Sequence, residues 1–136
     1  MSLRIMRPGL LAALIIPAAV AAIDNPDYGL GCPRESAIIA GRPEYSQPPI
    51  TVRCIARLTD KQSYNILVAN ETKDSATHWE LFTTPRDGLF TAYLPGRKPD
   101  HVRANTDIVD GGWHEIGMVM EERRVRLYVD GEMKAT

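Results

Sequence analysis

Cysteine and aromatic residues are scarce in this chain, and neither sign of charge is in excess. Its 136 residues include two cysteines, aromatic residues make up 7%, and the formal net charge is −1. A near-neutral chain has no basic face that would attract nucleic acid or an anionic membrane, so we expect neither as a partner. Gly and Pro number ten each, which is typical of a β protein with many turns.

Sequence patterns of catalytic sites are missing as well. The chain has no glycine-rich phosphate loop, no CxxC or HExxH pair and no GxSxG nucleophile turn. After residue 22 it has no segment of helical period long enough to form a stable helix. We therefore expect an all-β protein that is not an enzyme.

The N-terminal residues 1–22 have the pattern of a secretory signal peptide. Arg4 and Arg7 precede an apolar stretch, Leu10–Val20, and small residues follow at the expected cleavage site. A membrane anchor is the alternative, but a spanning helix needs about 20 apolar residues and this stretch is shorter. We expect a secreted or periplasmic protein with no membrane span once the signal peptide is removed.

The remaining chain divides into an extended arm, residues 23–49, and one domain, residues 50–136. Each part carries one cysteine, Cys32 in the arm and Cys54 in the domain. In an oxidising compartment the two can form a disulfide. The alternative is that Cys54 is a small core residue on its strand.

Alternation of apolar and polar residues with a period of two predicts short β-strands throughout the domain. In Ile50–Leu58, every second side chain from Ile50 onward is apolar. Turn residues separate the strands, with Pro85–Gly88 predicted as a hairpin turn. The other predicted strands are Tyr64–Ala69, Thr77–Thr84, Leu89–Leu94, Trp113–Met120 and Arg124–Val129, with short strand or edge pieces in 102–109.

Two turn motifs frame the last pair of predicted strands. Asp110–Gly112 precedes Trp113, and Asp130-Gly131 is a pair that tolerates the positive φ of a tight hairpin turn. Trp113 is expected to anchor the first turn by burying its ring. His114 shares its strand face with Ile116, so we expect a packed, hydrogen-bonded imidazole rather than a catalytic base.

The segments at these turns resemble one family. Residues 110–114 read DGGWH, residues 125–131 read VRLYVDG, and residues 50–57 read ITVRCIAR. They are similar to the motifs of the laminin-G-like and concanavalin-A-like lectin/glucanase jelly rolls, although Ile55 stands where that family often has Trp. The resemblance implies an antiparallel jelly-roll β-sandwich. It also implies further strands after Thr136, so we expect the domain to lack its C-terminal strands.

The resemblance implies ligand recognition, and a carbohydrate site would use aromatic rings that stack on sugars beside polar partners. The ligand-binding candidates are Trp79, Tyr93, Arg103 and Tyr128, with Arg86 and His101 as further hydrogen-bond donors. Trp79 shares its strand face with Leu81, so a core position is an equal alternative for it.

Calcium is the one cofactor that the resemblance implies, since many laminin-G-like modules bind it with hard oxygen ligands at a rim of the sandwich. Asp107 and Asp110, which flank the turn before Trp113, are the candidate metal ligands. Neither matches a family ligand motif. The alternative is that both are solvated turn carboxylates.

We therefore expect a secreted, non-catalytic binding module that recognises a glycan or an extracellular protein surface. Two alternatives stay open: an accessory module of a secreted hydrolase with its catalytic domain downstream, and a protein-adhesion module. A glycosidase of the same fold would need two carboxylates aimed at one sugar bond. The ExDxE strand motif of the retaining glucanases is missing from this sequence.

Overall fold

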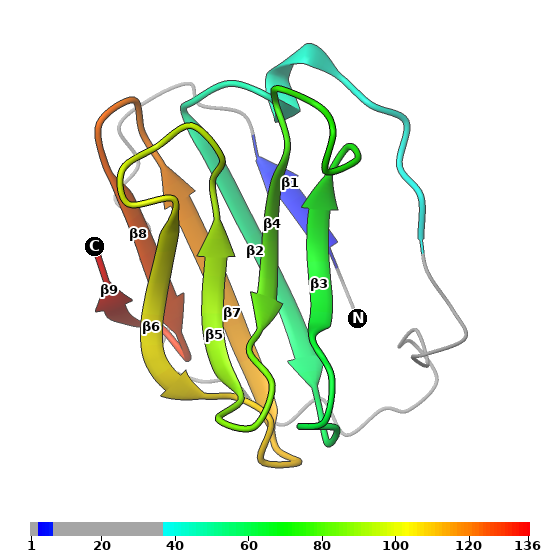
Figure 1. The fold of residues 1–136 in the computed structure, drawn as a ribbon, viewed down its shortest axis with the longest axis vertical. Helices are drawn as coiled ribbons and strands as arrows, with labels where there is room; N and C mark the ends of the chain where they lie inside the picture. Colours follow the sequence, from blue (N-terminus) through cyan, green and yellow to red (C-terminus); the bar gives the residue numbers. More distant parts are fainter. Residues whose placement is uncertain (1–2, 7–36) are drawn as a thin grey trace.

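A computed structural model describes residues 3–6 and 37–136, and within them the chain is a sandwich of two antiparallel sheets (Figure 1). The five-stranded sheet has the order β1-β2-β7-β8-β9, and the four-stranded sheet has the order β3-β4-β5-β6. The elements are β1 (Leu3–Met6), a 3₁₀ turn (Pro43–Tyr45), β2 (Ile50–Arg57), β3 (Asn65–Asn70), β4 (Trp79–Thr83), β5 (Leu89–Tyr93), β6 (His101–Asp107), β7 (Trp113–Met120), β8 (Val125–Val129) and β9 (Glu132–Ala135). The predicted all-β jelly-roll sandwich is confirmed.

The core forms between the two sheets from the apolar side chains that alternate along the strands. In β2 and β7, which pair along their whole lengths, the inward residues include Val52 and Met118, both fully buried. Phe90 and Leu81 face them from the four-stranded sheet, also at 0% exposure. The period of two therefore predicted which face of these strands is buried, because successive side chains of a strand point to opposite faces.

Residues 102–109 differ from the prediction of separate short pieces. Residues 102–107 belong to one strand, β6, which begins at His101 and forms an edge of the four-stranded sheet, and Ile108 and Val109 follow its end. A shift in register between Leu89 and Thr91 of the neighbouring strand β5 accommodates it. Such an irregularity bends the ladder without ending it, so the broken apolar pattern of this segment does not mark a strand end.

The predicted tight turns are present, and two of them require left-handed backbone. Asp130 and Gly131 have φ values of 51° and 82°. Positive φ at both central residues is what a type I′ turn of a two-residue hairpin requires. In the turn before β5, Gly88 has φ 67°, and a Cβ there would lie 2.2 Å from Oδ1 of Asp107. Gly88 is thus required both by its backbone and by the carboxylate beside it.

The N-terminal predictions fall mostly outside the described residues. Within the predicted signal peptide, Leu3–Met6 pairs with β2 as strand β1, while the apolar stretch, the cleavage site and Cys32 lie outside the described part. Export and the domain boundaries therefore stay predictions, as do further strands beyond Thr136. The described part of the chain contains no helix with the length and apolar character needed to cross a membrane.

Candidate functional site

An aromatic and polar cluster lies on the outward face of the four-stranded sheet, where β4, β5 and β6 run side by side (Figure 1). The register places Glu80 opposite Tyr93, and Tyr93 opposite His101. Directly opposed residues on antiparallel strands share a sheet face, with Cβ atoms about 5 Å apart. Their strand neighbours Leu81 and Ala92 are fully buried in the core. The row therefore points outward, and with His78 it forms what we call the outer-face cluster.

The rings of Tyr93 and His101 stack, with centroids 4.7 Å apart and planes inclined by 29°. Asp100 orients the imidazole, because its Oδ1 lies 2.8 Å from His101 Nδ1. This hydrogen bond also holds the pKa of Asp100 below its ordinary value. Tyr93 is half-buried and 43% of the His101 side chain is exposed, so the stack offers ring surface to solvent.

Glu80 is a buried carboxylate on a sheet face that points away from the core, and the residue is 5% exposed. Its Oε1 lies 3.3 Å from the ammonium of Lys73, and its Oε2 lies 3.5 Å from Nε2 of His78. Within the described part of the chain, neither oxygen accepts a closer hydrogen bond. Buried carboxylates normally accept several. Among the described residues, Glu80 thus accepts fewer close hydrogen bonds than a buried carboxylate usually does.

His78 turns one ring nitrogen to the backbone and the other toward Glu80. Its Nδ1 lies 3.0 Å from the carbonyl oxygen of Asn70, and because a carbonyl only accepts, Nδ1 carries the proton. Its Nε2 is buried and has no hydrogen-bond partner among the described residues. Nε2 thus faces Oε2 of Glu80 at 3.5 Å, too close for another group to lie between the two atoms.

Apolar side chains border the cluster on the side of β3. The ring of Phe82 meets His101 edge to face at a centroid distance of 6.2 Å and lies 5.7 Å from the ring of Tyr64. Tyr64 and Ile66 are 62% and 48% exposed. The outward face thus combines exposed ring and aliphatic surface with a carboxylate, which is the mixture typical of small-ligand sites.

The structure separates the predicted ligand-binding residues. Tyr93 belongs to the outer-face cluster, and Arg103 lies exposed on the same sheet face, two positions beyond His101 on β6. Trp79 is 3% exposed and donates its Nε1–H to the Tyr45 carbonyl at 2.7 Å, so the core alternative holds for it. Tyr128 lies on β8, in the other sheet.

Glu80 and His78 are functional candidates that sequence motifs do not single out. Their spacing is what indicates them. His78 directly precedes β4 and Glu80 lies two positions later, while the alternating residues Trp79 and Leu81 are buried in the core. An imidazole and a carboxylate at such a spacing share the outward face. Their burial could not be predicted, because the side chains that cover them come from other strands and loops.

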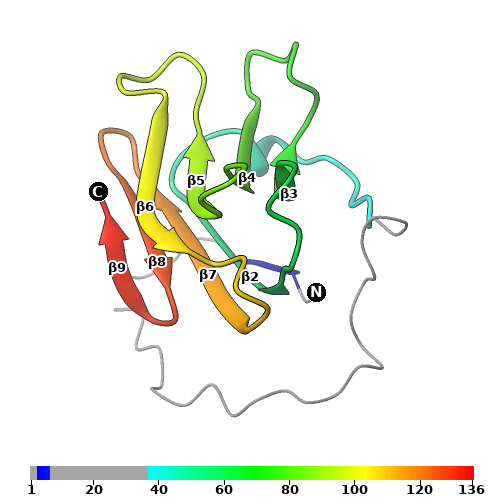
Figure 2. The same ribbon diagram turned by 60° about the horizontal axis from the view of Figure 1, so that its bottom comes forward.

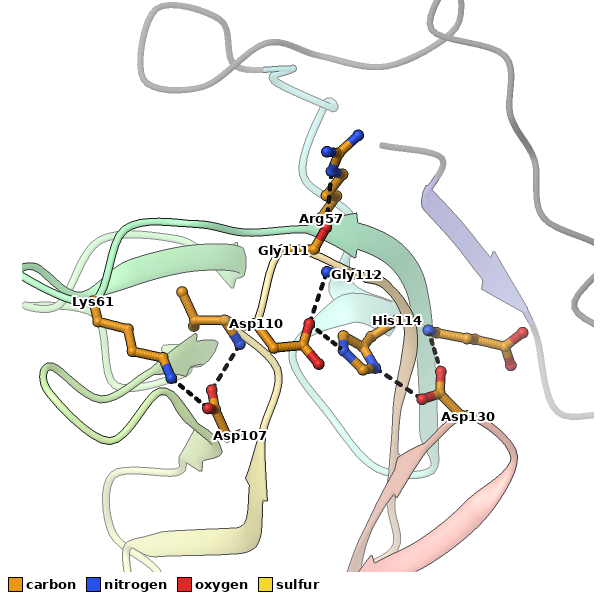
Figure 3. Close-up of polar contacts among 10 residues, drawn as sticks. Arg57, Lys61, Asp107, Asp110, Gly111, Gly112, His114 and Asp130 are labelled. Atoms are coloured by element: carbon orange, nitrogen blue, oxygen red, sulfur yellow. Dashed lines mark hydrogen bonds and ion pairs between the residues drawn. The ribbon is translucent and has the colours of Figure 1, made fainter.

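The predicted calcium ligands lie at the rim of the sandwich before β7 (Figure 3). Each carboxylate accepts the backbone N–H two residues ahead, at 2.8 Å for Asp107 and 2.7 Å for Asp110. Asp107 also pairs with Lys61, and Asp110 with His114. Hydrogen bonds from Lys61 and from the backbone lower the pKa of Asp107 and of Asp110, respectively. Among the described residues, no three His, Cys, Asp or Glu side chains are grouped to hold a metal ion, and calcium stays a prediction.

His114 connects this rim to the turn between β8 and β9 (Figure 3). Its Nδ1 lies 2.8 Å from Oδ2 of Asp130 and its Nε2 lies 3.1 Å from Oδ1 of Asp110. Asp130 Oδ1 also accepts the backbone N–H of Glu115 at 2.9 Å. Desolvation lowers the pKa of His114, but the hydrogen bonds to Asp130 and Asp110 outweigh it and raise the pKa. The imidazolium thus ties together two loops that are distant in the sequence.

The expectation that Trp113 buries its ring is wrong, since the residue is 37% exposed. Trp113 is the first residue of β7 and lies on the outward face of its sheet, opposite Arg57.

Cys54 is a free thiol on β2, buried in the core. Burial raises the pKa of this thiol to about 12. The core alternative for Cys54 therefore describes the structure, while Cys32 lies outside the described residues.

Comparison with known proteins decides the family. A family model described as the concanavalin A-like lectin/glucanases superfamily matches residues 39–136. The chain belongs to this superfamily. No curated protein and no solved structure matches it significantly. Concanavalin A-like domains of the laminin-G type are in general carbohydrate- or protein-binding modules. In this domain, the outer-face cluster combines partly exposed ring surface with a carboxylate.

Proposed function

We propose that this concanavalin A-like domain binds a carbohydrate on the outward face of its four-stranded sheet. The observation that carries the proposal is Glu80, a buried carboxylate with fewer close hydrogen bonds among the described residues than usual, next to the stacked rings of Tyr93 and His101. A sugar presents an apolar C–H face and a rim of hydroxyl donors, so one ligand can use both features at once. A neutral peptide side chain rarely offers that combination.

The expected binding mode divides the work between the two features. The exposed imidazole of His101, backed by Tyr93, supplies a flat surface of low conformational entropy. Glu80 accepts hydroxyl hydrogens, and hydrogen bonds to an ionised acceptor are about twice as strong as neutral ones. Lys73, whose ammonium lies 3.3 Å from Glu80 and whose side chain is 70% exposed, can donate to a sugar oxygen at the same site.

The proposed role is binding and not hydrolysis, because the sequence lacks the ExDxE strand motif of the retaining glucanases. A glycosidase of this fold would need two carboxyl groups roughly 5–9.5 Å apart, on either side of the scissile bond. Export is part of the same proposal and is supported by the signal-peptide pattern of residues 1–22.

The test is a glycan-array screen of the full chain, followed by calorimetric titration of the best ligand with Tyr93→Ala, His101→Ala and Glu80→Gln. Each variant is expected to weaken binding by about tenfold or more, which corresponds to about 1.4 kcal/mol. Tyr128→Ala is the matched control, because it removes a half-buried tyrosine from the other sheet. Loss of binding in this control, with binding unchanged in the other three variants, would overturn the proposal.

A protein surface is the second candidate ligand, favoured by the exposed Tyr64 and Ile66 beside Phe82. Aromatic residues in such positions are enriched at protein interfaces. If the array yields no glycan and Tyr64→Ala abolishes binding to an isolated extracellular protein, this second function replaces the first.

A further inference from the structure

The connection between β3 and β4 begins with an acceptor pattern for N-glycosylation that the proposed function does not use. Residues 70–72 read Asn-Glu-Thr, and an Asn followed two positions later by Thr, with no Pro between them, is the pattern to which an oligosaccharide is transferred. Figures 1 and 2 show this connection beyond the ends of its two strands, next to the 3₁₀ turn at residues 43–45. Its contacts decide whether the pattern can be used in the folded domain.

Asn70, the acceptor residue, is buried at the end of β3, where it is 8% exposed. Its Nδ2 donates to the carbonyl oxygen of Thr77 at 3.0 Å and to Oγ of Ser46 at 3.4 Å, so both amide hydrogens are in use. Its own carbonyl oxygen accepts from Nδ1 of His78 at 3.0 Å. Asn70 thus fixes the β3–β4 connection to the strand end and to the 3₁₀ turn.

The two acceptors of this amide are themselves held in place. Ser46 ends the 3₁₀ turn, and the preceding Tyr45 accepts the indole N–H of the buried Trp79 at 2.7 Å. Thr77 donates its hydroxyl hydrogen to Oε2 of Glu71 at 2.7 Å, within the same connection. Freeing the amide therefore requires the connection to open, which is a local unfolding event.

Transfer of an oligosaccharide to this amide needs space that the two acceptors occupy. In the reaction, Nδ2 forms a bond to the anomeric carbon of an oligosaccharide carried on a polyprenyl diphosphate. The bond from that carbon to the diphosphate oxygen breaks, the polyprenyl diphosphate leaves, and Nδ2 loses one proton to a base. With a new N–C bond of about 1.5 Å in place of either N–H, the anomeric carbon would lie within about 2 Å of the Thr77 or the Ser46 oxygen. Unbonded atoms overlap at that distance.

We propose that Asn70 is a modification site that folding closes: the unfolded chain accepts an oligosaccharide at Asn70, and the folded domain does not. The native contacts and the sugar compete for the same amide nitrogen, so the order of folding and transfer decides the state of the chain. A cell would use the site only in an exported chain, and in that respect the inference rests on the proposed export. The reaction with purified components tests it without that condition.

The experiment uses a purified single-subunit oligosaccharyltransferase with its polyprenyl-diphosphate donor, and it measures the occupancy of Asn70 by mass spectrometry. The native full chain is compared with the Leu81→Asp variant, in which a charge replaces a side chain that is 0% exposed, and with a synthetic peptide of residues 66–76. The variant is expected to be unfolded, which circular dichroism checks. The variant and the peptide are both expected to be modified at least about tenfold faster than the native chain.

A second acceptor in the same connection separates the contacts of Asn70 from a general resistance of the folded chain. Lys73→Asn creates the pattern together with Asp74 and Ser75, at a side chain that is 70% exposed. In the native state of this variant, residue 73 is expected to be modified at least about tenfold faster than Asn70. When Leu81→Asp is added to unfold the chain, the two rates should agree within about threefold.

Two substitutions that both remove the pattern separate the structural role of the Asn70 amide from its role as acceptor. Asn70→Gln moves the amide away from its two partners and should lower Tm by about 5 °C or more, because two hydrogen bonds of a buried side chain are lost. Thr72→Ala changes an exposed side chain and leaves these bonds in place, so it should change Tm by less than about 2 °C.

Three results would overturn the proposal. Modification of Asn70 in the native chain as fast as that of residue 73 in Lys73→Asn would show that the contacts do not close the site. No modification of Asn70 in the peptide and in the unfolded chain would show that the pattern is no acceptor. Equal resistance of residues 70 and 73 in the native state would assign the protection to the fold as a whole. None of these measurements depends on ligand binding, so a failure of the proposed carbohydrate site would leave them unchanged.

Discussion

Replacing Asp130 by alanine tests how the rim of the sandwich is held together. The side chain of Asp130 accepts the Glu115 backbone N–H at 2.9 Å and the His114 Nδ1–H at 2.8 Å. Its backbone is left-handed, with φ 51°, a conformation that Asp adopts more readily than Ala. The substitution therefore removes two hydrogen bonds and leaves an unfavourable residue in the turn.

The expected destabilisation is about 3–5 kcal/mol, the sum of three effects. An unpaired N–H on Glu115, a residue that is 4% exposed, costs about 1–3 kcal/mol. The bond to His114 contributes about 1–1.5 kcal/mol, below the usual range of about 1.5–3 kcal/mol for charged partners, because 46% of the Asp130 side chain is exposed. Placing Ala instead of Asp in the left-handed backbone conformation of residue 130 adds about 1 kcal/mol to the destabilisation.

The assay is urea and thermal unfolding of the full chain followed by circular dichroism. A loss of 3 kcal/mol in a domain of about 100 residues lowers Tm by roughly 12 °C or more. Asp130→Asn is the matched control, because its amide oxygen still accepts the Glu115 N–H and Asn tolerates the same φ. Asp130→Asn therefore isolates the bond to the charged His114.

The pH dependence of this control follows from the raised pKa of His114. A raised folded pKa gives stability that is fully present below the unfolded value of about 6.5 and is lost as the pH rises through the folded value. The difference in unfolding free energy between the native chain and Asp130→Asn should thus be largest below about pH 6.5. It should shrink as the pH rises through the raised pKa of His114. A gap that widens with pH, or Asp130→Ala within about 1 kcal/mol of the native chain, refutes the reasoning.

Three further predictions concern residues at other positions. Trp113→Ala should cost about 1–2 kcal/mol because the residue is 37% exposed, and Phe90→Ala about 3–5 kcal/mol because it is fully buried; equal losses in urea unfolding contradict this. The Cys54 thiol, with its pKa raised to about 12 by burial, should resist alkylation at pH 8 until the chain unfolds, and rapid native-state labelling seen by mass spectrometry argues against burial. Gly88→Ala, whose Cβ would lie 2.2 Å from a carboxylate oxygen, should lower Tm by several degrees more than Gly96→Ala, whose Cβ meets nothing within 4 Å, and similar shifts count against the packing argument.

Much of the fold was predictable because strand faces obey a period of two. The alternation of Ile50–Leu58 and Trp113–Met120 located β2 and β7 and showed which residues face the core. The pair Asp130-Gly131 located a turn, since few residues adopt its positive φ values. The motifs at residues 110–114 and 125–131 indicated the family, which the match to residues 39–136 confirms.

The candidate site was less accessible from sequence, because it is assembled across strands. Tyr93 could be named as an aromatic candidate, but its stack with His101 depends on the register between β5 and β6. Likewise, residues of the β5–β6 and β7–β8 connections line one pocket, although two strands separate these connections in the chain. Local patterns contain no information on which loops come together at one end of a sandwich.

The sequence by itself determined the local features, which are the positions of strands and turns and the apolar face of each strand. It also indicated the family. Only the tertiary structure decided burial and partnership. Trp113 was expected to be buried and is exposed, because burial depends on what packs opposite a side chain. Glu80 points away from the core and is nevertheless buried, since neighbouring strands and loops cover it. These properties arise from contacts between segments distant in sequence, and periodicity, which is a property of one segment, cannot encode them.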